Sequence, residues 1–286
     1  MRVRRLLDDA LFGPETGRRL VLVHSALAVL IALRVGLGPY RELARLPDAL
    51  FDPVPVLGFL SSMPSASAIA GIQVVGAVAA LLAAARRWPR VTFAIAWICY
   101  LVLAGLRGSR GKVLHNDLLL LWTSAVFLLA PVRASWRDRE PSREHGWPVR
   151  TAIVVAALIY FFAGYHKLRR SGIDWVTGDN MRYIRRWGPA IGEPALPSIS
   201  DRIADSPLAS HLTAAMLLGV ELAFPAVIWW RWLRPWLALA AAGLHVGTWF
   251  LLGLDYWAWA LAVPILLIDW STGWPMQRGR VFSRAD

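Results

Sequence analysis

The residues of this sequence that could do chemistry are a few ionisable side chains within or beside its apolar stretches. They are Arg34, His115, Lys167, Glu221 and His245. Placing such a group in a membrane is costly, so each is a candidate functional residue. A lysine kept away from bulk water has its charged form disfavoured and can act as a general base, while a neighbouring imidazole could relay a proton or stabilise a developing anion. These residue types predict proton transfer, with Lys167 as the base.

Each candidate also has a structural explanation that the sequence leaves open. Arg34 could extend to the outer lipid headgroups, and Lys167 could belong to a group of cations at those headgroups. His115 could belong to a helix cap with Asn116 or Asp117 as the capping residue. Glu221 and His245 could make hydrogen bonds between helices of a bundle. A metal site is not expected, because the histidines are scattered and no metal-binding motif is present.

The composition indicates a polytopic membrane protein. Hydrophobic residues make up 57% of the 286 positions. Charged residues make up 17%, below the roughly 25% of soluble domains. Sixteen tryptophans fit a chain that crosses membrane–water interfaces. The net charge of +12 does not predict nucleic-acid binding, because the arginines stand in short blocks between apolar segments. The single cysteine, Cys99, allows no intramolecular disulfide.

The apolar stretches predict an all-α bundle of about eight transmembrane helices, because they are continuous rather than alternating. The predicted spans are 20–37, 66–84, 91–106, 115–130, 149–165, 210–230, 235–252 and 255–269. An even number of spans leaves both termini on one side. Lys and Arg predict that this side is cytoplasmic, since 18 of the 31 fall in 66 inner positions and 12 fall in 82 outer positions. The expected location is the cell (inner or plasma) membrane.

The whole chain, 1–286, is predicted to be a single transmembrane domain without a large soluble outer domain. Its longest piece outside the membrane is the outer loop 166–209. In this loop Met181, Ile184 and Trp187 stand at helical spacing, which predicts a helix in the membrane interface followed by an irregular, Pro-rich cap.

In this topology four of the candidates fall in the outer half of the bilayer, on four different helices. They are Arg34, His115, Lys167 and His245. Side chains that only reach for headgroups would be expected near both faces of the membrane. The bias therefore predicts a shared polar cavity that opens outward.

Substrate-binding residues are predicted around the lysine. Tyr160, Gly164 and Lys167 are spaced i, i+4 and i+7 and share one helix face. Gly164 would let a neighbouring helix or a ligand approach closely. The predicted substrate-binding set is Arg34, Asn116, Tyr160, Gly164, Trp175 and Glu221.

The stretch YFFAGYHKLRRSGIDWVTGDNMRY, which contains Lys167, resembles a motif of the membrane part of vitamin K-dependent γ-glutamyl carboxylase. The same motif is found in its bacterial relatives, the HTTM (horizontally transferred transmembrane) family. The shared pattern is Tyr-Phe-x-Ala-Gly-x-x-Lys-Leu, then Asp-Trp-Val-x-Gly and a Met. HNDLLLL, from His115, and LHVGTWFLLGLDYWAWALAVPIL, around His245, resemble two further spans of that family. The resemblance thus extends over essentially the whole chain.

The resemblance implies roles for three residues. In the carboxylase, the lysine of the motif deprotonates reduced vitamin K on the lumenal side. Oxygen addition then creates a strong base that removes a γ-proton from glutamate before CO2 is added. By resemblance, Lys167 would be the base, His115 the functional histidine and His245 a pocket histidine. The implied cofactors are a reduced, vitamin K-like quinone, O2 and CO2.

Two departures from the carboxylase change the expected partners. His166 stands where the carboxylase has the first of two adjacent lysines, and the large lumenal domain that holds the protein substrate has no counterpart. A propeptide-bearing substrate is therefore not expected. The expected partners are membrane lipids and a lipid-soluble small-molecule substrate.

Two functions remain open at this point. The first is a quinol-oxidising, epoxidising or carboxylase-like membrane enzyme with Lys167 as base. The second is a non-catalytic transporter, lipid-binding or assembly protein on the same fold. A salt bridge from Lys167 to Glu221 or Asp174 would favour the second.

Overall fold

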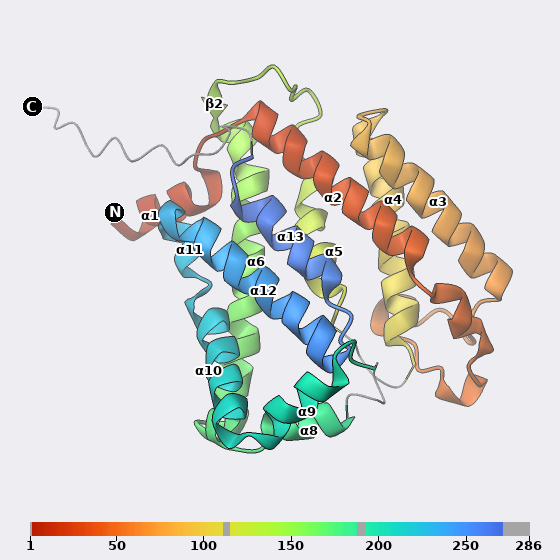
Figure 1. Cartoon of the computed structure of the whole chain (residues 1–286). Helices are drawn as coiled ribbons and strands as arrows, with labels where there is room; N and C mark the ends of the chain where they lie inside the picture. The colour runs from red at the N-terminus through yellow and green to blue at the C-terminus, as the bar shows by residue number, and fades with distance from the viewer. Residues whose placement is uncertain (1, 111–114, 188–192, 271–286) are drawn as a thin grey trace, which may run out of the picture.

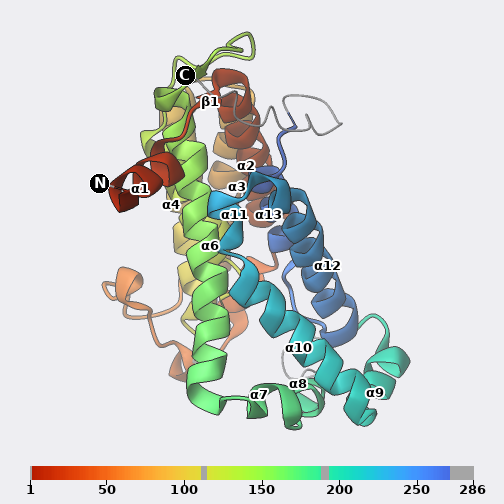
Figure 2. The same ribbon diagram turned by 90° about the vertical axis from the view of Figure 1, so that its left-hand side faces the viewer.

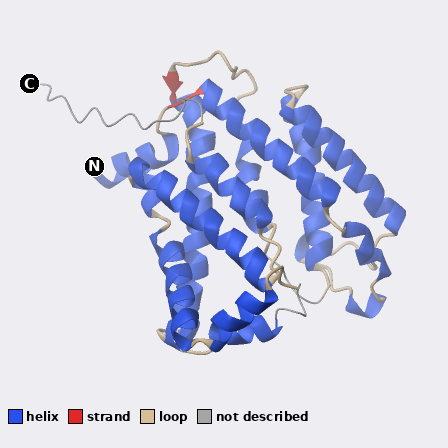
Figure 3. Cartoon of the chain, in the orientation of Figure 1, coloured by secondary structure: helices blue, strands red, loops and turns tan. Residues whose placement is uncertain are grey.

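The computed structural model describes residues 2–110, 115–187 and 193–270, which form a helical bundle (Figures 1 and 3). The long helices are α2 (Gly17–Leu37), α3 (Ala66–Ala84), α4 (Pro89–Gly108), α6 (Arg143–Ser171), α10 (Pro207–Ala223) and α12 (Arg234–Leu252). The shorter ones are α1 (Arg2–Phe12), α5 (Leu118–Ala125), α7 (Asp174–Thr177), α8 (Asn180–Trp187), α9 (Pro197–Asp205), α11 (Ala226–Trp229) and α13 (Trp257–Leu267). The 3-10 turns are η1 (Tyr40–Arg45), η2 (Asp48–Leu50), η3 (Pro55–Leu57), η4 (Val126–Leu129) and η6 (Arg231–Leu233). The predicted all-α class is confirmed.

Within the described residues, five helical segments are long and apolar enough to cross a membrane. They are Gly17–Arg45, Ala66–Ala84, Pro89–Gly108, Arg143–Ser171 and Arg231–Leu252. A sixth arises only if α9 and α10, bent by 99° at their junction, are taken as one span. The predicted spans 115–130 and 255–269 correspond to the shorter helices Leu118–Leu129 and Trp257–Leu267.

The two shorter helices are the reason why the predicted total of eight spans remains a prediction. The 11 residues of α13 extend for about 17 Å, roughly half of the hydrocarbon core of a bilayer. The cytoplasmic placement of the termini also remains a prediction, and residues 271–286 at the C-terminal end lie outside the described part of the chain.

Local sequence explains where several of the long helices begin and end. Ser65 and Ser142 cap α3 and α6, because their side-chain oxygens accept hydrogen bonds from the backbone N–H groups of Ala68 and His145. The end of α12 is set by Gly253, whose φ of 66° lies in the left-handed region that glycine adopts without strain.

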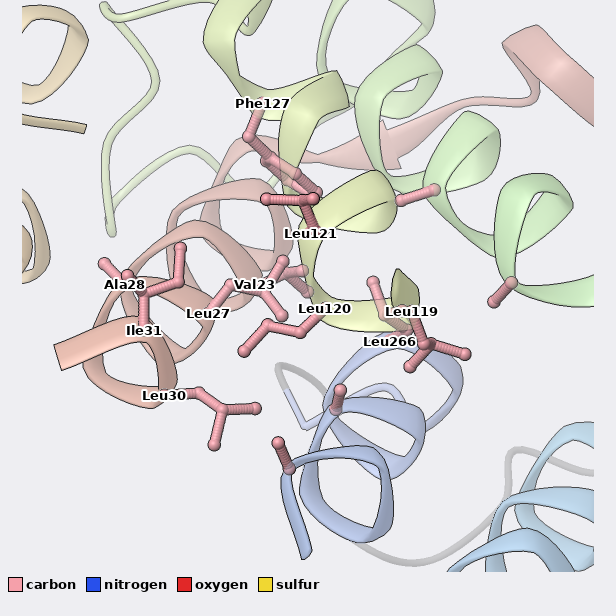
Figure 4. Close-up of a cluster of buried hydrophobic side chains, with 14 of the residues drawn as sticks. Val23, Leu27, Ala28, Leu30, Ile31, Leu119, Leu120, Leu121, Phe127 and Leu266 are labelled. Carbon is pink, nitrogen blue, oxygen red and sulfur yellow. The ribbon is translucent and has the colours of Figure 1, made fainter. Parts of the chain in front are cut away.

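The bundle has two halves that meet along α2, α5 and α13. Helices α2, α3 and α4 pack together, and α6, α10, α12 and α13 form the other half (Figures 1 and 2). Buried side chains of α2, α5 and α13 fill the space between them (Figure 4), among them Val23, Leu27, Ile31, Leu120 and Leu266. This core holds α5 and α13 against α2.

Apolar side chains also cover the outside of the bundle. Val74, Val75 and Val78 are exposed on α3, and Trp236 and Leu239 are exposed on α12. Soluble proteins rarely expose apolar surface of this extent, whereas lipid is a suitable solvent for it. The exposed faces thus agree with an integral membrane protein.

The two ends of the bundle are built differently. At one end β1 (Glu15–Thr16) pairs antiparallel with β2 (Pro141–Ser142) and ties the start of α2 to that of α6. Here a Cβ on Gly146 would lie 2.0 Å from the Gly13 carbonyl oxygen, so the close contact requires glycine. At the opposite end α7, α8 and α9 lie across the bundle (lower part of Figure 1). The helix predicted in the outer loop is α8. The prediction that the Pro-rich part after it is irregular is wrong for Pro197–Asp205, which forms α9 with a proline at its first position.

Candidate functional site

Lys167 forms an ion pair with Glu221, which joins α6 to α10. Its Nζ contacts Glu221 Oε1, and the two side chains are 22% and 10% exposed. A Cβ on Gly164 would come within 3.0 Å of Glu221 Cβ, so the glycine lets α10 approach closely, as predicted for a neighbouring helix. The ring of Trp175 lies 5.3 Å from Lys167 Nζ, within cation–π range. Lys167 is therefore the partner of a carboxylate and not an isolated amine.

Tyr160 and His245 form a second polar pair, about two helical turns deeper along α6. The Tyr160 hydroxyl lies 2.5 Å from His245 Nε2, and both side chains are buried. The Tyr160 ring stacks on Phe224 at 4.0 Å between centroids and meets the edge of Trp259. His245 thus makes a hydrogen bond between helices, which is the structural explanation that the sequence analysis offered for it. Aromatic side chains surround the pair.

His115 forms the third pair, with Tyr256 in the turn between α12 and α13. Its Nε2 lies 2.5 Å from the Tyr256 hydroxyl. The rings of Tyr256 and His245 are 5.4 Å apart, which connects this pair to the second one. The pair places a hydroxyl and an imidazole nitrogen, two groups that can exchange a proton, within hydrogen-bond distance of each other.

The three predicted catalytic residues thus belong to one group of side chains, which we call the polar cluster. It consists of His115, Tyr160, Lys167, Glu221, His245 and Tyr256. Lys167 is within electrostatic range of both histidines. Of the predicted substrate-binding residues, Tyr160 and Glu221 belong to the cluster, and Gly164 and Trp175 lie against it. What these side chains can do together is accept, hold and pass on protons.

The predicted binding residues Arg34 and Asn116 lie beside the cluster, in a separate arginine–aspartate network. Arg34 donates to Asp117 Oδ1 at 2.7 Å and to Asp255 Oδ2 at 2.8 Å, and Arg107 donates to Asp255 at 2.8 Å. Asn116 donates to the backbone oxygen of Asp255 at 3.0 Å. Arg34 is only 3% exposed, so it does not extend to the headgroups.

This network fixes two residues of the cluster through the backbone. Asp117 stands two positions after His115, and Asp255 stands one position before Tyr256. His115 and Tyr256 are the residues that hydrogen-bond to each other. The Asp117 carboxylate is engaged with Arg34 and with the Tyr100 hydroxyl, at 2.9 Å, and makes no cap bond to α5. Asp117 thus occupies the N-cap position of α5, but its side chain does not make the capping hydrogen bond.

Sequence reasoning missed Tyr256, Asp255, Asp117, Arg107 and Tyr100. A signal existed for two of them. The stretch LLGLDYW leaves almost no loop between two apolar segments, and an aspartate in so short a turn needs a partner within the bundle. Nothing in the sequence pointed to the buried Tyr100.

A cavity of about 770 Å³ lies next to the cluster, between α10 and α12, with α8 and α9 at its outer end. Its walls are mostly apolar and include Met216, Val220 and Leu244. Lys167, His115 and His245 are not among its lining residues. The predicted shared polar cavity is thus replaced by two neighbouring features, a closely packed polar cluster and an apolar cavity.

The cavity has polar groups only toward its outer end. Arg185, Ser200, Thr213 and Thr248 line it there, and Arg185 is itself paired with Asp201 at 2.8 Å. Deeper in the bundle, a Cβ on Gly219 or Gly243 would meet nothing within 4 Å. The space therefore changes from polar to apolar with depth.

The described residues contain no group of three His, Cys, Asp or Glu side chains placed to hold a metal ion. Comparison of the chain with protein-family models, with curated proteins and with solved structures finds no match. The likeness of the lysine motif to the carboxylase and HTTM proteins rests on the sequence motifs alone.

Proposed function

We propose that this chain is a multi-pass membrane protein that binds a lipid-soluble small molecule of the quinone type in the cavity between α10 and α12. The observation that supports this proposal most directly is the cavity itself. Its volume, about 770 Å³, falls in the range of roughly 300–1,000 Å³ that is usual for small-molecule sites. A polar outer end above a deep apolar part suits a quinone ring with an isoprenoid tail. In this proposal α7, α8 and α9 lie on the outer side of the cell membrane.

Filling the cavity tests this proposal. Gly243→Leu places a side chain into the open space, and we expect it to weaken binding of a naphthoquinone with one isoprenoid unit by roughly tenfold. Binding is measured by quenching of tryptophan fluorescence in detergent-solubilised protein. Gly71→Leu is the matched control, because Gly71 also has nothing within 4 Å but lies on α3. Equal binding by both variants and the wild type contradicts the proposal.

A second candidate function is deprotonation of a bound reduced quinone at the polar cluster. It is favoured by the three hydrogen-bonded or ionic pairs of the cluster and by the likeness of the lysine motif to that of the carboxylase. Glu221 would take the proton of Lys167, and the neutral amine would then take the hydroxyl proton of the quinol. Glu221 Oε2 has no hydrogen-bond partner among the described residues and is free to receive it. Reactions with O2 and CO2 lie beyond this step.

Two observations make this reaction the less favoured candidate. Lys167 does not line the cavity in which the small molecule is proposed to bind, and it is engaged in an ion pair. A lysine that forms the cation of a pair must lose its proton before it can act as a base, and the salt bridge to Glu221 is the feature expected of a non-catalytic protein. Binding of the small molecule requires no such step, so it is the function that the geometry supports best.

Lys167→Arg distinguishes the two candidates. Arginine retains the ion pair with Glu221 but does not deprotonate in proteins. If Lys167 is a base, the quinolate that it generates should react with O2 dissolved in the assay, which accepts the two electrons. Membranes with the wild-type chain should then oxidise a reduced naphthoquinone faster than membranes without it, and the variant should add at least about tenfold less activity with unchanged quinone binding. Absence of oxidation by the wild type, or equal rates for the two proteins, rejects the catalytic candidate and leaves the binding proposal intact.

A further inference from the structure

Four arginines converge at the end of the bundle opposite to the polar cluster. They are Arg19 of α2, Arg150 of α6, Arg231 of η6 and Arg234 of α12, and they surround Glu15 of β1. Arg19 Nη1 and Arg231 Nη2 each lie 2.8 Å from a Glu15 carboxylate oxygen, and Arg150 Nη1 lies 4.0 Å away. Arg234 is within electrostatic range of the other three arginines. We call this group the arginine site.

Positive charge exceeds negative charge in the arginine site. Arg19, Arg150 and Arg234 are buried, and so is Glu15. A second carboxylate, that of Asp269, lies at the edge, 3.9 Å from Arg19. Arg150 is also within electrostatic range of the Asp9 carboxylate, which leaves three carboxylates for four guanidinium groups. Other acceptors that Arg150 and Arg234 reach are the backbone oxygens of Asp9 and Val227, which carry no net charge. Guanidinium groups in this arrangement repel one another unless a further anion is present.

Several donors of the arginine site are also unsatisfied. Arg19 Nε, Arg150 Nε and Nη1, and Arg234 Nη2 are buried and have no hydrogen-bond partner among the described residues. Buried polar groups without partners are costly, and charged ones more so. The site thus offers N–H groups from three helices to an anion with several acceptor oxygens.

We propose that the arginine site binds a phosphate-type oxyanion, supplied by the headgroup of an anionic phospholipid or by free phosphate. The planar guanidinium matches the oxygens of phosphate with two parallel hydrogen bonds, and arginine is preferred where such an anion must be held away from water. Arg231, 57% exposed, is the member at the surface and would meet the anion first. This site is separate from the quinone cavity, so its test does not depend on the proposed function.

The test measures thermal unfolding of the wild-type chain in dodecyl maltoside. One arm adds inorganic phosphate, with chloride at equal ionic strength as its control. The other adds dioleoyl phosphatidylglycerol, with dioleoylglycerol, which lacks the phosphate, as its control. We expect at least one arm to raise Tm by about 3 °C or more over its control, because an anion that binds only the folded state stabilises it. A rise with the lipid alone identifies the headgroup as the source, and a rise in both arms shows that free phosphate suffices. No rise in either arm overturns the proposal.

Variants link that rise to the arginine site. In Arg150→Gln/Arg234→Gln the rise should disappear, whereas Arg143→Gln should retain it. Arg143 is the matched control because it lies on α6, two turns before Arg150, and is 65% exposed. An equal rise in the double variant and the control places the anion elsewhere and overturns the proposal.

A variant with the opposite expected effect covers the case in which the double variant does not fold. Glu15→Gln removes the carboxylate that competes with the bound anion, so phosphate or phosphatidylglycerol should bind roughly threefold more tightly or better. Unchanged or weaker binding by Glu15→Gln contradicts the proposal.

Discussion

Replacing Arg34 with methionine should lower the free energy of unfolding by about 4 kcal/mol, as is typical when one partner is removed from a buried ion pair. Arg34 bridges Asp117 on one side and Asp255 on the other. In its absence the two carboxylates are left with Arg107, whose second contact, to Asp117 Oδ2, is long at 3.5 Å. Reversible denaturant unfolding in detergent micelles measures the loss.

Arg41→Met is the control for this variant. Arg41 is exposed in η1, a few residues beyond the end of α2, and its loss should change stability by less than about 0.5 kcal/mol. The Arg34 variant should also release the turn before α13, so that the backbone amide of Tyr256 exchanges with deuterium faster. An Arg34 variant as stable as the Arg41 variant would show that the arginine–aspartate network contributes nothing to the fold.

Replacing Lys167 with methionine should lower the free energy of unfolding by about 3 kcal/mol, because the Glu221 carboxylate then remains without its cation at a helix interface. Its exposed fraction, 10%, leaves little water to replace the lysine. In Lys167→Met/Glu221→Leu most of the stability should return, since two apolar side chains replace the pair. The double-mutant cycle gives the coupling energy directly.

Arg169→Met is the control here, because Arg169 is exposed on the same helix two residues later. If Lys167→Met is no more damaging than Arg169→Met, the ion pair does not hold α6 and α10 together. Lys167 would then not be explained by a structural role in the ion pair with Glu221. Proton transfer would become the better explanation of its position.

Hydropathy predicted the first and last residues of some helices correctly, whereas for other helices it predicted only part of their length. The predicted span 66–84 coincides with α3, because its apolar run starts directly after the capping Ser65. In contrast, α6 extends from Arg143 to Ser171 around the predicted 149–165. Apolar residues mark only the part that suits lipid, whereas the cap at Ser142 and good helix formers continue the helix beyond it. The predicted span 210–230 is interrupted after Ala223 by Pro225, which has no N–H for a helical bond.

The sequence could predict that residues of the candidate site lie together. It could not predict which side chains of the site hydrogen-bond or form ion pairs with one another. Counting charges placed His115, Lys167 and His245 on one side of the membrane, and in the structure they share one cluster. The pairings depend on contacts between residues far apart in the sequence, 141 positions for His115 with Tyr256 and 221 for Arg34 with Asp255. A single sequence carries no record of such contacts, so it left open whether Glu221 would meet Lys167.

The unequal lengths of α6 and α13 have a consequence for how molecules and protons would move. The 29 residues of α6 extend for about 44 Å, and Tyr160 lies about 17 Å before its outer end. The non-helical turn before α13 reaches this level of the bundle, because the ring of Tyr256 lies 5.4 Å from that of His245, the partner of Tyr160. The residues of this turn are half-buried. Under the proposed function, a quinone would enter the cavity between α10 and α12. Protons would instead pass along the hydrogen-bonded pairs of the polar cluster, so the two would move by separate routes.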